Sequence, residues 1–243
     1  MRTLTFAKRC AKDILRDPLN LAFGLGFPLV LLVLLNTMQK NIPTDMFIIE
    51  HLAPGIVVFG LSFITLFSAT LIARDRESAL LQRLYTTPLS SLGFIVGYTL
   101  PLIPISMAQG AVSFILAAVL GLKFGINVVS AILVTGIISV FYISLGLLFG
   151  SILNVKQVGG VCGGLLTNLS AWMAGIWFDL SLIGGAFEKV ARLLPFYHAV
   201  ELERALVNGD YSGSAEHFII VVIYAIFTVV CASVLFLRQM KKQ

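Results

Sequence analysis

Side chains that could bind a metal or act as a nucleophile are few and scattered along this 243-residue sequence. Among the three histidines, His198 has a carboxylate at helical spacing, because Glu201 follows three residues later. Glu201 in turn lies three residues before Arg204, and an oppositely charged pair at that spacing stabilises a helix by roughly 0.2–0.5 kcal/mol. We interpret Glu201 and Arg204 as a structural ion pair and predict no metal site.

The three cysteines, Cys10, Cys162 and Cys231, are odd in number and far apart, which predicts neither a disulfide framework nor a zinc site. The sequence contains no Gly-x-x-x-x-Gly-Lys-Ser/Thr phosphate-binding loop, and no His-Glu-x-x-His, Gly-x-Ser-x-Gly or Cys-x-x-Cys motif. We therefore predict that this chain is not an enzyme and has no cofactor of its own.

The composition indicates a membrane protein. Only 12% of the residues are charged and 58% are hydrophobic, whereas about a quarter of an average soluble domain is charged. A bilayer core about 30 Å thick is crossed by a helix of about 20 apolar residues, and six charge-free stretches are that long. They predict an all-α integral membrane protein, one transmembrane domain over residues 1–243, with spans at about 19–38, 52–73, 94–120, 128–149, 158–178 and 217–237.

The distribution of basic residues predicts the orientation. If both termini are cytoplasmic, twelve of the seventeen Lys and Arg residues fall in cytoplasmic tails and loops, as the positive-inside rule requires. The net charge of +5 is then a topology signal. We expect contact with membrane lipid and none with nucleic acid.

Two amphipathic helices are predicted on the cytoplasmic side. Residues 5–17 place Phe6, Cys10 and Ile14 on one line, which is typical of a helix on the membrane surface, and Pro18 ends it. A second such helix is predicted after the second span and ends at Pro88, with leucines on one face and arginines on another.

The longest outer loop, residues 179–216, contains apolar residues among its charges. Re-entrant or interfacial helices would bury these apolar residues and keep irregular backbone away from lipid. The sequence predicts that such helices break around Gly184, Gly185 and Pro195.

The fifth span begins with Gly159, Gly160, Gly163 and Gly164, two overlapping pairs at i, i+4. Such pairs let another helix backbone approach closely. They predict close packing, either within the subunit or between subunits.

Large aromatic side chains in and beside the spans are candidates for the lining of a substrate route, namely Phe27, Phe63, Trp172 and Phe178. Ordinary lipid-facing aromatic residues would show the same pattern. The centres of the six predicted spans carry no Asp, Glu, Lys or Arg, which argues against a proton-coupled carrier or a voltage-gated channel. Together these features predict a transport pathway powered by another protein.

The order of these segments resembles the permease subunits of bacterial type-2 ABC exporters over nearly the whole chain. The resemblance rests on the surface helix before the first span, on RDRESALLQRLYTTPLS at residues 74–90 and on LPFYHAVELERALVNGD at residues 194–210. In that family the stretch matching 74–84 is a coupling helix that sits in a groove of a separate ATPase. The resemblance assigns this role to Arg74, Asp75, Arg76, Glu77, Leu80, Leu81, Arg83 and Leu84, where a solvated juxtamembrane face is the alternative.

The resemblance also implies that two permeases, identical or homologous, pair with two ATPase subunits, which bind the ATP and magnesium. It places the subunit interface near the first and fifth spans, where the glycines lie. It implies export, from a bacterial inner membrane, of an apolar or amphipathic substrate such as a drug, an antibiotic or a lipid, a function associated with multidrug or antibiotic resistance. The alternatives are a non-transport membrane component, such as an assembly or sensory partner, and export of a lipid-linked polysaccharide.

Overall fold

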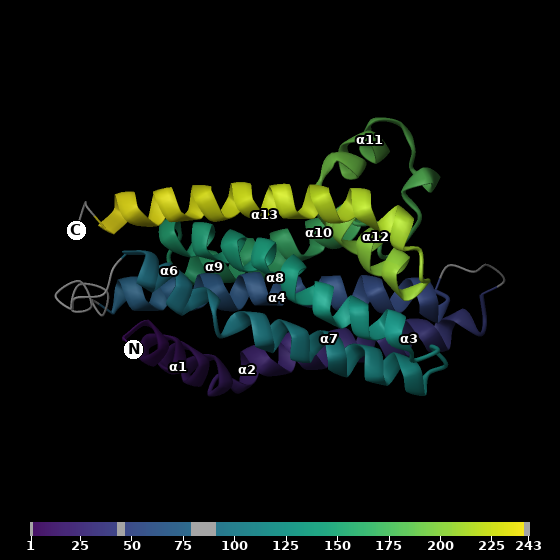
Figure 1. Ribbon diagram of the computed structural model, residues 1–243, viewed down its shortest axis with the longest axis horizontal. Coiled ribbons are helices and arrows are strands. Elements are labelled where there is room, and N and C mark those ends of the chain that lie inside the picture. Colours follow the sequence, from purple (N-terminus) through teal and green to yellow (C-terminus); the bar gives the residue numbers. More distant parts are fainter. Residues whose placement is uncertain (1, 43–46, 79–90, 241–243) are drawn as a thin grey trace.

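The computed structural model describes residues 2–42, 47–78 and 91–240, and all regular elements in these ranges are helices (Figure 1). In chain order they are α1 (Arg2–Leu15), α2 (Pro18–Leu21), the π-helix η1 (Ala22–Gly26), α3 (Phe27–Gln39), α4 (Ile49–Glu77), α6 (Ser91–Thr99), α7 (Leu102–Val119), α8 (Ile126–Ile152), α9 (Val155–Val158), the π-helix η2 (Gly159–Leu166), α10 (Thr167–Met173), the short 3₁₀ helix η3 (Leu180–Leu182), α11 (Gly185–Leu193), α12 (Pro195–Val207) and α13 (Tyr211–Met240).

Five helical segments are long and apolar enough to cross a membrane, where the sequence predicts six. They are Ala22–Gln39, Ile49–Glu77, Gly93–Val119, Ile126–Ile152 and Tyr211–Phe236. The remaining prediction, a span at 158–178, corresponds to α9, η2 and α10, which end at Met173. Polar residues such as Thr167 and Asn168 lower the hydropathy of this segment, and Gly175, at a φ of 64°, begins a turn where the span was expected to continue.

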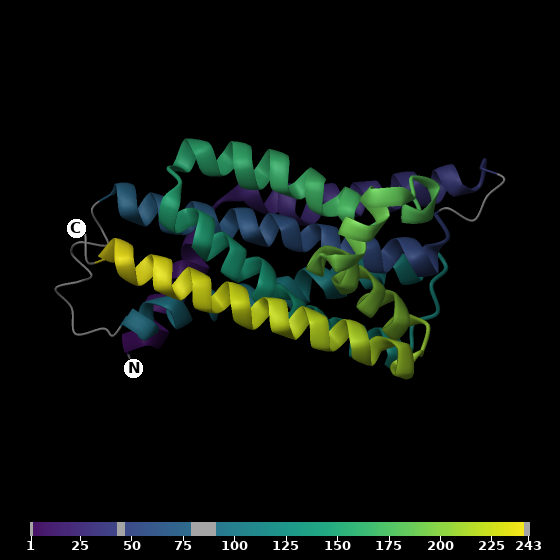
Figure 2. The ribbon, with the colours of Figure 1, turned by 90° about the horizontal axis from the view of Figure 1, so that it is seen from above.

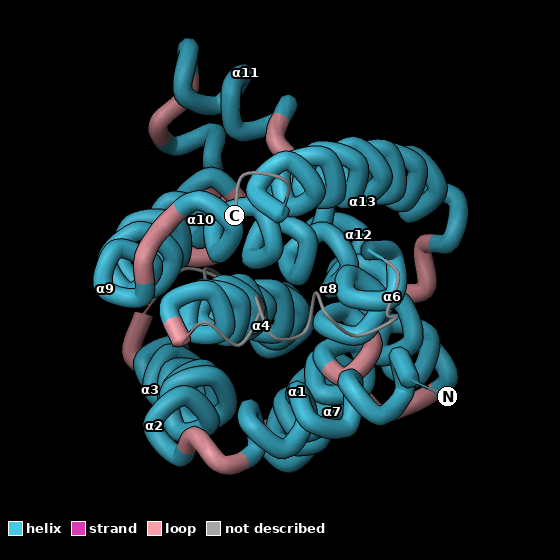
Figure 3. Tube along the Cα trace, turned by 90° about the vertical axis from the view of Figure 1, so that its left-hand side faces the viewer, coloured by secondary structure: helices cyan, strands magenta, loops and turns pink. Residues whose placement is uncertain are grey.

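Helix α4 is the centre of the bundle, and other helices surround it on every side (Figure 3). It contacts α3, α7, α8, η2 and α12, and its side chains are buried along nearly the whole helix. This explains why α4 carries small and hydroxylated residues among its apolar ones, because a helix with neighbours on all sides needs close approaches and internal hydrogen bonds.

The closest approach is between α4 and α8, at Gly146 and Gly150. A Cβ atom on Gly150 would lie 2.6 Å from the carbonyl oxygen of Ala69, and one on Gly146 would lie 2.5 Å from that of Thr65. Beside these glycines, the Thr65 hydroxyl donates a 2.8 Å hydrogen bond to the carbonyl of Tyr142. The small residues let the backbones approach, and the hydroxyl then bonds across the gap.

Both described ends of the chain lie at the same end of the bundle, which we call the terminal end (Figures 1 and 2). Here the line Phe6, Cys10 and Ile14 of α1 is buried, as its spacing predicts. The Phe6 ring packs edge-on against Phe94 and Tyr98 of α6, and burial raises the pKa of the Cys10 thiol to about 12. Helix α1 is therefore docked on the bundle through its apolar line.

At the opposite end, the segment between α10 and α13 forms η3, α11 and α12. The helices break where the sequence predicts, since Gly184 and Gly185 both have positive φ and α12 starts at Pro195. Helix α12 packs against α4, α8 and α13, whereas α11 projects from the bundle (Figure 1).

We expect Gly150→Ala to lower the free energy of unfolding by about 1–3 kcal/mol, because overpacking against the Ala69 backbone cannot be relieved by a rotamer change. Gly125→Ala is the control, since a Cβ atom there meets nothing within 4 Å and its extended backbone accommodates alanine. The measurement is thermal unfolding of the detergent-solubilised protein, followed by tryptophan fluorescence. Equal unfolding temperatures for the two variants would contradict this account of the α4–α8 contact.

Candidate functional site: the charge cluster at the end of α4

Helix α4 ends at the terminal end of the bundle with four consecutive charged residues, Arg74, Asp75, Arg76 and Glu77. We call them the α4 charge cluster. Successive residues of an α-helix point about 100° apart, so four in a row point in four directions. Each of them bonds to a different part of the structure.

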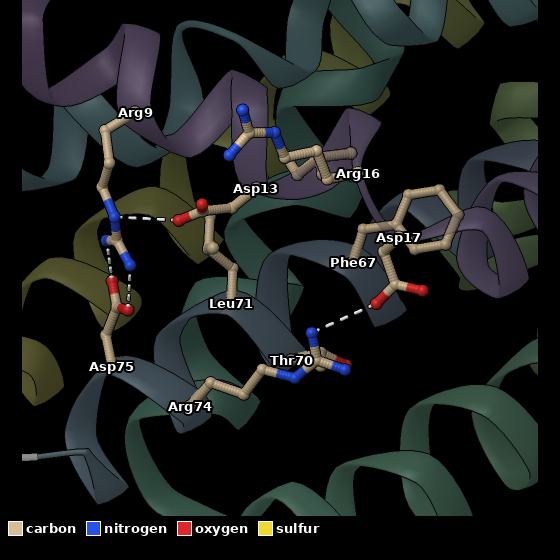
Figure 4. A pocket seen from close by; sticks show the side chains of 10 residues that line it. Arg9, Asp13, Arg16, Asp17, Phe67, Thr70, Leu71, Arg74 and Asp75 are labelled. Carbon is tan, nitrogen blue, oxygen red and sulfur yellow. Dashed lines mark hydrogen bonds and ion pairs between the residues drawn. The ribbon is translucent and has the colours of Figure 1, made fainter.

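Asp75 points into the bundle and is 2% exposed. Its carboxylate accepts two hydrogen bonds from the Arg9 guanidinium, at 2.5 and 2.6 Å (Figure 4). It accepts a third from the Tyr98 hydroxyl, at 2.8 Å. The Arg9 Nε atom also pairs with Asp13 at 2.8 Å. The bidentate, charge-assisted contact with Arg9 ties α4 to α1, and the hydrogen bond from Tyr98 ties α4 to α6.

The hydrogen bond from Arg9 to Asp75 raises the pKa of the guanidinium above its ordinary value, against the opposing effect of burial. Arg9 therefore stays charged at every physiological pH. A buried carboxylate needs such a partner, because an unpaired charge in this position is strongly unfavourable.

Arg76 bonds to the end of α8. Its guanidinium donates a 2.8 Å hydrogen bond to the carbonyl of Gly150, one of the last α8 carbonyls, which have no partner within their own helix. A cation at a helix C-terminus is also favoured by the helix dipole.

Glu77 makes the converse contact at the start of α9, where its carboxylate accepts a 2.9 Å hydrogen bond from the Val155 amide. Arg74, whose side chain is exposed, pairs with Asp17 at 3.1 Å, just before α2 (Figure 4). The end of α4 is thus bonded to α1, α6, α8 and α9 and to the residue that precedes α2. A displacement of this end moves all of them together.

A cleft of about 200 Å³ lies between α1 and α4 beside the cluster (Figure 4). Its lining contains three arginines and three aspartates, so their formal charges cancel. The lining residues are Arg9, Asp13, Ile14, Arg16, Asp17, Phe67, Thr70, Leu71, Arg74 and Asp75.

The structure describes half of the residues that the sequence assigns to ATPase coupling. The predicted partners Leu80, Leu81, Arg83 and Leu84 lie outside the described residues. Within the described half, Asp75 does not face an external partner as expected, because Arg9 and Tyr98 occupy its carboxylate inside the chain. Arg9, 66 residues away, is the partner of Asp75 that the sequence did not reveal.

Three of the four glycines of the fifth span have no close packing partner among the described residues of the chain. A Cβ atom on Gly159, Gly160 or Gly164 would meet nothing within 4 Å, and one on Gly163 would lie 3.3 Å from Leu66. The described chain supplies the packing partner only at Gly163, so the prediction of packing between subunits stays a prediction for the others.

The aromatic residues proposed for a substrate route divide into separate groups. Phe27 and Phe63 lie with ring centroids 6.1 Å apart, in a cluster that also contains Phe59 and Trp177. Phe178 lies beside Phe187 of α11.

Trp172, on α10, is 51% exposed on the surface of the chain. The four candidates therefore do not line one described route. A role in substrate passage stays a prediction for each of them.

Glu201 and Arg204 form the predicted ion pair at 2.8 Å. Arg204 also donates to the carbonyl of Gly175, so the pair ties α12 to the turn after α10. His198 bonds to His217 of α13, with 2.8 Å between their Nδ1 atoms, and burial together with His217 lowers the pKa of His198. These contacts are structural links between α12 and its neighbours.

Comparison with known protein families gives a match over most of the chain. The family described as ABC2_membrane, ABC-2 type transporter, matches residues 1–208. This range includes α1, the α4 charge cluster and α12. A search of curated proteins gives no match.

We expect Arg9→Met to lower the free energy of unfolding by about 3 kcal/mol, because removing one partner of a buried pair leaves the other charge uncompensated. Arg74→Met is the matched control, since its pair with Asp17 is exposed and contributes less than about 1 kcal/mol. Denaturant unfolding of the purified protein measures both variants.

The double variant Arg9→Met, Asp75→Leu should recover part of the loss, because it removes the buried charge with its partner. Equal costs for Arg9→Met and Arg74→Met would show that the Asp75 contact is no stronger than a surface ion pair.

Proposed function

The chain belongs to the ABC-2 type transporter family, and we propose that it is the permease of an exporter that moves apolar or amphipathic molecules, such as drugs, antibiotics or lipids. As an ABC-2 permease it is a multi-pass transmembrane component that works with an ABC ATPase and is not itself that ATPase. Export, the substrate class and the composition of the complex are the proposed parts.

The terminal end of the bundle is the cytoplasmic end in this proposal. The positive-inside rule supports it, because α1, the α4 charge cluster and the last turn of α13 bring Lys and Arg residues to this end. A partner that binds ATP in the cytoplasm would meet the permease here.

The observation that carries the proposal is the bonding of the α4 charge cluster. The cluster is the first part of the stretch, residues 74–84, that the resemblance assigns to the ATPase groove. A movement of the rest of that stretch pulls on the last turn of α4, which is bonded to α1, α6, α8 and α9. The cluster would thus convert a local displacement into a shift of several helices.

A conformational change of this kind requires that ATP or substrate bind the two arrangements with different affinity. In the proposed cycle, ATP closes a dimer of ATPases, and two permeases shift between inward-open and outward-open arrangements. The second permease, identical or homologous, would pack on the exposed glycines Gly159, Gly160 and Gly164. Phe27, Phe59, Phe63 and Trp177 form an aromatic cluster in which Phe27 is exposed and Phe59 and Phe63 are buried, and its apolar character suits an uncharged cargo.

The test is co-purification of the permease with the ABC ATPase encoded beside it, with ATPase activity measured in lipid. The coupling variant is Leu80→Asp with Arg83→Glu, since a Glu77 substitution would also remove the hydrogen bond to Val155. The matched control is Leu193→Asp with Lys189→Glu, the same chemical change on two exposed residues of α11 at the opposite end.

We expect the coupling variant to lose the complex and its ATPase stimulation and the control to keep both. Stimulation of the native complex by apolar drugs or lipids supports the proposed substrate class. A native chain that binds no ATPase would overturn the exporter proposal in favour of a non-transport membrane component.

A further inference from the structure

Glu203 is a carboxyl group buried at the interface between α12 and the bundle. It is 0% exposed, although in the sequence it lies among the charges of an outer loop. The buried face of α12 has apolar residues at helical spacing, and Glu203 is the acidic residue among them. This stripe is made by Phe196, Ala199, Val200, Glu203, Leu206 and Val207, and Pro195, His198 and Leu202 of the same helix are buried as well.

The contact that Glu203 makes lies deep along α8. Its Oε1 atom is 2.7 Å from the hydroxyl oxygen of Thr135, which is nine residues after the first residue of α8, Ile126. At 1.5 Å per residue this is about 13 Å from the end of that helix. An ionised carboxylate at such a position is very unfavourable unless a cation or several donors face it.

The Thr135 hydroxyl does not supply those donors. Its oxygen lies 3.0 Å from the carbonyl of Ala131 as well as 2.7 Å from Glu203. A hydroxyl has one hydrogen, so with an ionised Glu203 one of these two short contacts would join two acceptors. With a proton on Glu203 Oε1, the carboxyl donates to Thr135, and Thr135 donates to Ala131.

The other carboxyl oxygen, Oε2, is buried and has no hydrogen-bond partner among the described residues. A partnerless carbonyl oxygen is unfavourable, but much less so than a partnerless carboxylate oxygen. Both oxygens therefore favour the neutral acid in this arrangement.

The surrounding charges do not change this conclusion. Burial raises the pKa of Glu203 to about 8, and the hydrogen bond with Thr135 opposes the rise only in part. Helices α8 and α10 contain no charged residue. Other helices that pack on α12 do carry titratable groups at this end, but none of these groups contributes to the pKa of Glu203. They are Glu50 and His51 of α4, Glu188, Lys189 and Arg192 of α11, and Glu216 and His217 of α13.

We propose that Glu203 is a proton-binding site that holds a proton while α12 is packed on α8 and releases it to water when this contact opens. On release the carboxyl O–H bond breaks, its electron pair stays on the carboxylate, and water accepts the proton. The opening belongs to the transport cycle, and this part rests on the proposed function. Alkaline conditions on the side of the membrane facing α12 then favour the opened arrangement, and acidic conditions favour the packed one.

Infrared spectroscopy of the purified permease tests the site directly. We expect the C=O stretching band of a protonated carboxylic acid at neutral pH, absent from Glu203→Gln and lost as the pH rises through about 8. Glu216→Gln, a change at an exposed carboxylate, is the matched control and keeps the band. A wild-type protein without the band at neutral pH, or a Glu203→Gln protein that keeps it, overturns the proposal.

The unfolding temperature gives a second measurement with a defined sign. Between the ordinary pKa of glutamate, about 4.3, and about 8, the folded state binds a proton that the unfolded state has released. Stability from this group therefore falls as the pH rises across that interval. We expect the wild type to show this fall and Glu203→Gln to lack it, and parallel pH profiles for the two proteins contradict the proposal.

Neither measurement uses the ATPase, so failure of the coupling test leaves both results standing. The transport part is tested separately, by the pH profile of the ATPase activity of the complex. We expect Glu203→Gln to flatten that profile and Glu216→Gln to leave it unchanged. If Glu203 is protonated but the wild type and Glu203→Gln have identical pH profiles of ATPase activity, the proton site stands and its link to transport is overturned.

Discussion

A helix enclosed by other helices inside a bilayer has no water to satisfy its polar groups, and α4 is in this position over most of its length. Each hydroxyl or charge on it must find a partner in a neighbouring helix. Ser62 bonds to Ser170 of α10, Thr65 and Ser68 bond to carbonyls of α8, and Asp75 bonds to Arg9 and Tyr98. The neighbours of α4 are therefore held in register by its polar groups, and the rest of the bundle is arranged around those contacts.

This constraint differs between the two ends of α4. At the terminal end, charged residues bond outward to several helices, and the contacts are directional. At the opposite end, α12 fills the space between α4, α8 and α13 mainly with apolar side chains. Apolar contacts can slide and separate with less penalty than charge-assisted hydrogen bonds. The contact between α12 and α8, which has one polar link at Glu203, is the one that the proposed opening separates.

Much of this fold follows from local properties of the sequence. The length of the charge-free stretches predicted the long apolar helices, and Gly184, Gly185 and Pro195 predicted the breaks before α11 and α12. Both predictions rest on hydropathy and backbone preference, which act within a few residues. The predicted fifth span, 158–178, corresponds to a helical segment that ends at Met173, because a turn at Gly175 follows it. The pairing of Arg9 with Asp75 could not be predicted, because it joins residues 66 positions apart that only the packing of α1 brings together.

The two buried carboxylates show why partner geometry, more than burial, decides what an acidic residue does in this protein. Asp75 accepts three hydrogen bonds, two of them from a cation, and so holds α1 and α6 on α4. Glu203 contacts the Thr135 hydroxyl, which has one hydrogen and also contacts the Ala131 carbonyl. No cation among the described residues faces Glu203, so it is stable in its place only with a proton of its own. In the sequence both lie among other charged residues, Asp75 between Arg74 and Arg76, and Glu203 beside Arg204. The apolar stripe at 196, 199, 200, 206 and 207 nevertheless marks position 203 as buried, and that periodicity is the signal by which a carboxyl without a charged partner could be found.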